Sequence, residues 1–67
     1  MTLAPGDLVQ YKNDPGRLAI IINVDTTGTG AEVCELVIVH DKEFPGTVGE
    51  KRYTNQDYWR KIPQKPI

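Results

Sequence analysis

Few residues in this 67-residue chain could carry out chemistry, and the first candidates are the single cysteine and the single histidine. Cys34 could act as a nucleophile with His40 as its base, and the neighbouring Asp41 could orient the imidazole of His40. Cys34 and His40 belong to one predicted strand, however, and a rise of about 3.3 Å per residue separates them by roughly 20 Å. We therefore expect His40 to be a surface residue and the chain not to be an enzyme.

The sequence predicts no cofactor and no metal site. One cysteine can form no intrachain disulfide and offers no second thiol for a structural zinc site. The Gly28-Thr29-Gly30 segment is not followed by the helix and the Lys-Ser/Thr pair of a phosphate-binding loop, so we interpret it as a hairpin tip. The acidic residues lack the regular spacing of a calcium loop. Cys34 lies in a largely apolar run, 33–37, which indicates a buried thiol in a reducing, cytoplasmic setting.

Aromatic side chains are the remaining candidates for a binding site. Trp59 is predicted to fill the core, which would turn Tyr58 outward. A cage for a methylated Lys or Arg would require Tyr11, Phe44 and Tyr53 to converge around the cation. We keep such a cage as an alternative to a structural role for these three residues.

The formal net charge of −1 argues against a dedicated nucleic-acid-binding domain, which is usually clearly basic. The charges are nevertheless unevenly distributed. Between residues 25 and 50 the only Lys or Arg is Lys42, and the acidic residues are Asp25, Glu32, Glu35, Asp41, Glu43 and Glu50. Between residues 51 and 67 the only acidic residue is Asp57, and the basic residues are Lys51, Arg52, Arg60, Lys61 and Lys65. Such a domain could stack head to tail with its own copies; the alternative interpretation is a mixed, solvated surface.

Alternating polar and apolar residues, interrupted by turn signals, predict strands throughout the chain, and no window has the spacing of an amphipathic helix. We expect five strands, at 7–12, 18–24, 32–40, 47–54 and 59–62. Turns are expected at 13–16, 26–30 and 41–46, and a short helical turn capped by Asn55 is expected at 55–58. The side chains expected in the core are Val9, Ile20, Ile22, Val24, Leu36, Ile38, Trp59 and Ile62.

The length predicts one domain, 1–67, with extended terminal arms at 1–5 and 63–67. The start of the chain lacks a basic region followed by a long apolar stretch, so we expect no signal peptide. The longest apolar run, 18–22, is too short to cross a membrane. We therefore expect a soluble protein.

Three segments carry a resemblance to a known fold, and they are Pro5-Gly6-Asp7-Leu8-Val9, Leu18-Ala19-Ile20-Ile21-Ile22-Asn23-Val24 and Tyr58-Trp59-Arg60-Lys61-Ile62. Four strands followed by a helical turn and a short fifth strand resemble the SH3-like barrels of the Tudor and KOW type. Small stand-alone proteins encoded by tailed bacteriophages are similar in size and in order of elements. The resemblance implies an all-β fold, a small five-stranded SH3-like barrel with a short helical turn before the last strand.

These features predict a non-enzymatic structural or adaptor protein that docks on other protein subunits or on its own copies, with a phage particle as one setting. One alternative is a nucleic-acid-binding module that uses the basic 51–61 region, with Tyr53 or Tyr58 stacked on bases. Another is a small phage-encoded inhibitor of a host protein. The expected location is the cytoplasm of the host, or the virion. The candidate partner-binding residues are Tyr11, Phe44, Lys51, Arg52, Tyr53, Tyr58, Arg60 and Lys61.

Overall fold

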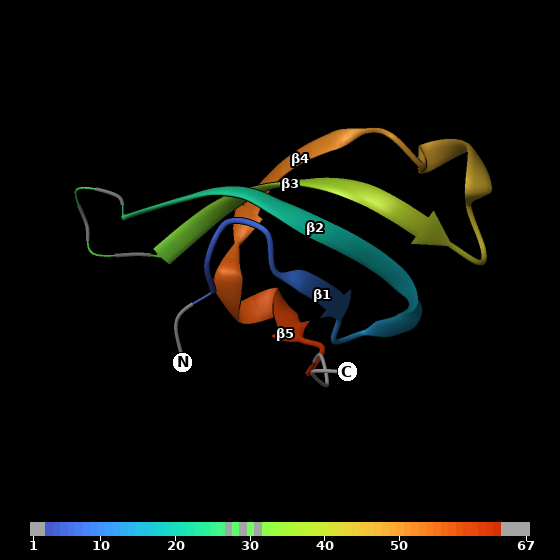
Figure 1. Cartoon of the computed structure of the whole chain (residues 1–67), viewed down its shortest axis with the longest axis horizontal. Helices are drawn as coiled ribbons and strands as arrows, with labels where there is room; N and C mark the ends of the chain where they lie inside the picture. The colour runs from blue at the N-terminus through green and yellow to red at the C-terminus, as the bar shows by residue number, and fades with distance from the viewer. Residues whose placement is uncertain (1–2, 27, 29, 31, 64–67) are drawn as a thin grey trace.

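A computed structural model describes residues 3–26, 28, 30 and 32–63 of the chain (Figure 1). The strands are β1 (Leu8–Tyr11), β2 (Asp14–Thr26), β3 (Glu32–Asp41), β4 (Lys51–Asn55) and β5 (Trp59–Lys61). Two short 3-10 turns, η1 (Pro45–Thr47) and η2 (Gln56–Tyr58), precede β4 and β5. The prediction of an all-β chain with a helical turn before its last strand is confirmed.

All five strands belong to one antiparallel sheet in the order β4-β3-β2-β1-β5. The two edge strands, β4 and β5, follow each other in the chain and are separated only by η2. A connection this short can join opposite edges only if the sheet curls strongly, and Figure 1 shows the chain descending from β4 past the sheet to β5. Within the part of the chain that the structure describes, no ladder joins β4 to β5, so the predicted closure into a barrel is not found.

Two β-bulges in the ladder between β2 and β3 decide which side chains face the core. Ile21 pairs with Leu36 and Asn23 with Glu35, so Ile22 is an extra residue on β2. Val39 is likewise an extra residue on β3, because the pairing steps from Ile38 to His40 while β2 advances by one residue. An extra residue reverses the alternation of the strand beyond it. The inward face of each strand is therefore different on the two sides of its bulge.

The buried hydrophobic side chains are Leu3, Val9, Ala19, Ile21, Cys34, Leu36, Ile38 and Trp59. The prediction is confirmed for Val9, Leu36, Ile38 and Trp59 and is wrong for Ile20 and Ile22, which are 38% and 40% exposed. The physical reason is the register: Val9 pairs with Ala19, which turns the odd-numbered residues of this part of β2 inward. Val24 still packs against the core, because the bulge at Ile22 restores its inward direction. Ile62, also expected in the core, is half-buried.

Several predicted boundaries shift. The first hairpin turns at Lys12 and Asn13, and Asp14, expected in the turn, instead pairs with Tyr11 and opens β2. The ladder between β1 and β2 then skips residues 15–17, of which Pro15 has no N–H to donate. Residues 45–47, partly assigned to the fourth strand, form η1, so β4 begins at Lys51. The predicted tip at 26–30 lies partly outside the described residues.

The cap at Asn55 is confirmed, because its side chain accepts a hydrogen bond of 2.8 Å from the N–H of Asp57. The next residue, Gln56, is buried and joins distant segments. Its Nε2 donates to the carbonyl of Val33, and its Oε1 accepts from the N–H of Leu3. Leu3 therefore belongs to the core rather than to a free N-terminal arm, whereas residues 1–2 and 64–67 of the predicted arms lie outside the described range. No helix among the described residues is long and apolar enough to cross a membrane.

The register of β2 makes a direct prediction about stability. Ile21 is 1% exposed and Ile20 is 38% exposed. We expect Ile21→Ala to lower the free energy of unfolding by about 2–5 kcal/mol, because the truncation leaves a cavity in the core. Ile20→Ala is the matched control and should cost about 1 kcal/mol or less. Urea unfolding followed by Trp59 fluorescence measures both values, and a larger loss for Ile20→Ala would contradict the register.

Candidate functional site

A hollow of about 220 Å³ opens between the β4 edge and the β1–β5 side of the curled sheet. We call it the seam hollow, and its walls are Tyr11, Arg17, Ile38, Arg52, Tyr53, Thr54 and Trp59. Because two of these residues, Ile38 and Trp59, are also part of the core, the hollow is the open end of the core itself. It brings aromatic rings, an aliphatic floor and two guanidinium groups into one place.

Strand pairing positions the walls of the seam hollow. Arg52 pairs with Leu36 and Thr54 with Cys34, so the side chains of both β4 residues lie on the core side of the sheet. On the opposite wall, Tyr11 of β1 pairs with Trp59 of β5. The seam hollow is thus built from the two ends of the strand order, which the curl of the sheet brings together.

Arg17 and Tyr11 form a fixed stack on one wall. The guanidinium carbon of Arg17 lies 5.2 Å from the centre of the Tyr11 ring, within the range of a cation–π contact. The Tyr11 ring in turn contacts the Trp59 ring, with the centroids 5.1 Å apart and the planes tilted by 57°. The three side chains support one another, which limits their rotation and pre-organises this wall.

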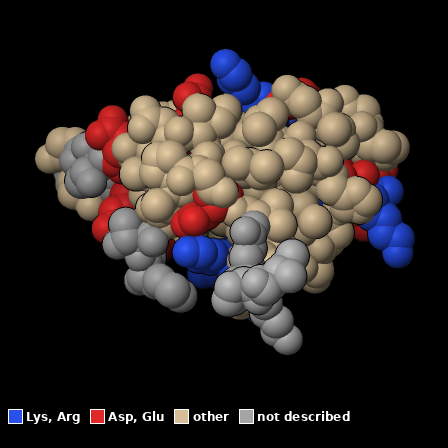
Figure 2. Space-filling model, in the orientation of Figure 1, with Lys and Arg blue, Asp and Glu red and all other residues tan. Residues whose placement is uncertain are grey.

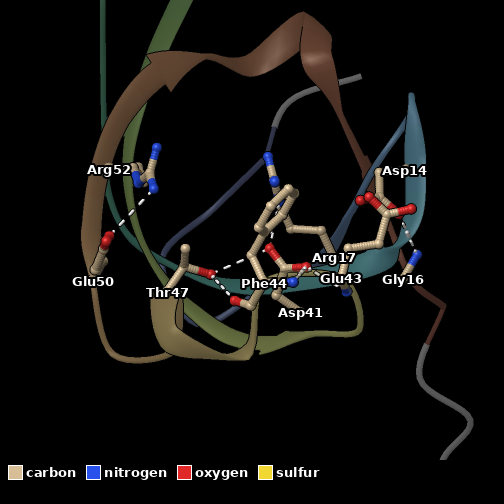
Figure 3. Close-up of polar contacts among 9 residues, drawn as sticks. All are labelled: Asp14, Gly16, Arg17, Asp41, Glu43, Phe44, Thr47, Glu50 and Arg52. Carbon is tan, nitrogen blue, oxygen red and sulfur yellow. Dashed lines mark hydrogen bonds and ion pairs between the residues drawn. The ribbon is translucent and has the colours of Figure 1, made fainter.

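Asp41 holds Arg17 in place from the inside (Figure 3). The bulge at Val39 turns Asp41 toward the core, where it is 2% exposed and its Oδ2 accepts a 2.9 Å hydrogen bond from Nε of Arg17. The same oxygen accepts from Oγ1 of Thr47 at 3.2 Å. Its other oxygen accepts from the N–H groups of Glu43 and Phe44, at 3.1 and 3.0 Å. One carboxylate therefore ties the start of β2 to the loop after β3 and to η1.

The charge state of Asp41 follows from these contacts. Burial of the carboxylate raises the pKa of Asp41, but the hydrogen bond from the Phe44 N–H, those from Arg17 and Thr47, and the positive charge of Arg17 outweigh it. The pKa of Asp41 therefore lies below its ordinary value of 3.8. This arrangement leaves the carboxylate ionised at neutral pH.

Arg52, the second guanidinium of the seam hollow, is held more loosely. It forms an ion pair of 3.3 Å with Glu50, and both side chains are about half exposed, at 49% and 46%. Surface pairs of this kind contribute little to stability, so Arg52 can change partner at small cost. Figure 3 shows Arg52 on the β4 wall and Arg17 on the opposite side of the same space.

The structure brings together three of the predicted partner-binding residues, Tyr11, Arg52 and Tyr53. Arg60 and Lys61 line a second hollow of about 240 Å³ on the other side of Trp59, together with Leu3, Lys12, Gln56 and Asp57. Neither hollow includes the remaining three, Phe44, Lys51 and Tyr58, although all three are exposed. Phe44 does not line the seam hollow with Tyr11 and Tyr53.

The candidate residue that the sequence analysis missed is Arg17. The available signal was its position two residues before Ala19 and four before Ile21, on the inward face of β2. That signal was hidden because the predicted strand began at Leu18 and because Ile20 and Ile22, instead of Ala19 and Ile21, were expected on its inward face. The Cys34–His40 pair is not formed: Cys34 is buried, and burial raises the pKa of its thiol, whereas His40 is exposed. Among the described residues, no group of three or more His, Cys, Asp or Glu is placed to hold a metal ion.

The outer face of the sheet is the second candidate surface. Leu8 pairs with Ile20, and Ile20 pairs with Val37, which sets three aliphatic side chains in a row across β1, β2 and β3. Leu18 lies on the same face, and the two bulge residues, Ile22 and Val39, are exposed at 40% and 38%. We call this set the outer apolar face, and its members are Leu8, Leu18, Ile20, Ile22, Val37 and Val39.

Comparison of the chain with protein-family models, with curated proteins and with solved structures found no match. The function must therefore be argued from the two surfaces.

The carboxylate of Asp41 gives the stability of the fold a pH dependence with a definite sign. Because its folded-state pKa is lowered, its contribution is complete above 3.8 and is lost as the pH falls through 3.8 toward the folded-state pKa. We expect Asp41→Asn to be less stable than the unmodified chain at pH 7, with a difference that shrinks between pH 5 and pH 3. Urea midpoints at each pH measure it.

Glu43→Gln provides the matched control, because Glu43 is exposed and only its backbone N–H contacts Asp41. This variant should keep the pH dependence of the unmodified chain. Parallel loss of stability in Asp41→Asn and the unmodified chain over the same pH range would show that Asp41 does not carry the effect.

Proposed function

We propose that this chain is a non-enzymatic docking domain that binds other protein subunits through its outer apolar face. The observation that carries the proposal is the outward direction of Ile20, Ile22 and Val39, which form the outer apolar face with three half-buried aliphatic neighbours. Single exposed aliphatic residues are common on protein surfaces. Three exposed aliphatic residues beside three half-buried ones, all on neighbouring strands, are typical of a surface that another protein covers.

The charges around the outer apolar face also favour a protein partner. Its nearest charged neighbours in the strand pairing are Lys51, opposite Val37, and Glu35, opposite Asn23. Figure 2 shows one face of the molecule with a broad uncharged area, and acidic and basic side chains lie at its margins and just below its middle. An apolar centre with a charged rim is the usual composition of a protein–protein interface.

We further propose that the curled sheet is an open variant of the SH3-like barrel and that its setting is a phage particle. The strand order supports the first part, because β5 pairs with β1 and a 3-10 turn separates β4 from β5. The small size of the domain and its apolar outer face suit a building block within a larger assembly, which supports the second part.

The double substitution Ile20→Lys with Ile22→Lys tests the docking function. Two ammonium groups on the outer apolar face would have to be desolvated in an apolar interface, so we expect affinity for a protein partner to fall at least about tenfold. The partner is identified by cross-linking in the native cells, and its affinity is then measured with purified proteins. Circular dichroism confirms that the variant stays folded.

Val48→Lys is the matched control, because Val48 is 48% exposed but lies outside the outer apolar face. It should bind like the unmodified chain. Equal affinity of the double variant and the control would overturn the proposal, as would a chain that stays monomeric and cross-links to no protein in its native cells.

A further inference from the structure

The two guanidinium groups of the seam hollow are each ion-paired, with Asp41 and with Glu50, but these pairs leave most of their N–H donors unused. Arg17 donates from Nε to Asp41, and in the described part of the chain no hydrogen bond uses its two terminal amino groups. A guanidinium has five N–H donors, so four of them remain for a ligand. Arg52 adds a second guanidinium whose partner, Glu50, is exposed and exchangeable.

The indole of Trp59 adds an unused donor to the same region. Trp59 is 6% exposed, lines the seam hollow, and its buried Nε1–H has no acceptor among the described residues. Buried donors are nearly always paired, because an unpaired one retains the full cost of its desolvation. Trp59 also lines the second hollow and its Nε1 is buried, so the indole signal reports on binding nearby rather than supplying a contact to the ligand.

From this geometry we propose that the seam hollow binds the carboxylate of an acidic residue on the protein partner, between the guanidinium groups of Arg17 and Arg52. Paired N–H donors of a guanidinium match the two oxygens of a carboxylate, and such charge-assisted hydrogen bonds are stronger than neutral ones. Tyr53, which is 67% exposed, forms the outer wall against which the neighbouring backbone of the partner packs. The inference rests on the proposed docking function, because the carboxylate belongs to the same protein partner. It names the chemical group that the seam hollow recognises.

The surroundings of Tyr53 favour an isolated carboxylate over a nucleic acid. On its other side Tyr53 borders a small hollow of about 110 Å³ whose lining includes Asp25 and Glu35. A strand of nucleic acid with a base stacked on Tyr53 would place a further phosphate near these carboxylates. A cationic ligand is disfavoured as well, because two guanidinium groups face the seam hollow. A single carboxylate is compatible with both features, because it is negative and brings no second negative group near Asp25 and Glu35.

Nuclear magnetic resonance of the 15N-labelled chain tests the proposal with defined probes. The first is an acetylated and amidated pentapeptide with glutamate at its centre and glycine elsewhere. The second replaces the glutamate by glutamine, and the third is an acetylated triglycine with a free C-terminal carboxylate. We expect the glutamate peptide to shift the Nε–H signals of Arg17 and Arg52 and the single indole signal of Trp59, with a Kd in the millimolar range, and the glutamine peptide to shift none of them.

Matched arginine variants locate the binding. Arg52→Gln should raise the Kd of the glutamate peptide about tenfold, the effect expected for loss of one charge-assisted hydrogen bond. Arg60→Gln removes the same charge from the second hollow and should leave the Kd unchanged. The amide spectrum of each variant reports whether it is folded. Equal Kd values for Arg52→Gln and Arg60→Gln would overturn the proposed site.

The remaining outcomes separate the alternatives. Binding of triglycine alone would assign the site to a chain terminus, and equal binding of the glutamine peptide would overturn the carboxylate proposal. Salt-dependent binding of a thymidine decanucleotide at Tyr53, without binding of the glutamate peptide, would favour the nucleic-acid alternative.

The double variant Ile20→Lys with Ile22→Lys separates this proposal from the docking function, and it should leave peptide binding intact. If the peptide fails to bind but this double variant still loses the partner, only the carboxylate site is refuted.

Discussion

The two bulges in the β2–β3 ladder are the constraint on which the rest of the structure depends. Each bulge reverses the alternation of its strand, so the same two strands turn different residues inward at their two ends. The bulge at Val39 brings Asp41 inside, opposite Arg17, and the bulge at Ile22 returns Val24 to the core. Without the bulge at Val39, the continuous alternation of β3 would turn Asp41 to the outer face and leave Arg17 without its internal partner.

Asp41 converts this local irregularity into a long-range connection. Its carboxylate joins β2, the loop after β3 and η1 through four hydrogen bonds, and it fixes the guanidinium of Arg17 over Tyr11. A buried ion pair of this kind contributes little net stability, because both charges lose hydration, but it strongly disfavours arrangements that leave one partner alone. Its main effect is therefore to specify a single geometry for the wall of the seam hollow.

Much of this architecture could be predicted from the sequence, and the wrong assignments in the core of β2 have one cause. Turn residues and alternation gave the five strands, the Asn55 cap and the burial of Trp59. The stretch Ile20-Ile21-Ile22 is apolar at every position, so either alternation fits it, and a bulge leaves no mark in such composition. The error placed Ile20 and Ile22 inside, and Arg17 was missed because it lay before the predicted start of the strand. Of the candidate site, Tyr11, Arg52 and Tyr53 were named as candidates because aromatic and basic residues are recognisable without knowledge of the register.

The open seam explains why the two surfaces have different characters. The outer apolar face lies on the continuous middle of the sheet, where paired backbone leaves only side chains for contact. The seam hollow lies where the ladder is interrupted, so it presents charged donors and aromatic edges instead. A carboxylate that binds Arg17 and Arg52 together connects β2 to β4 across this gap. Because it would bind the folded chain and not the unfolded one, it would add stability where the sheet lacks a ladder of its own.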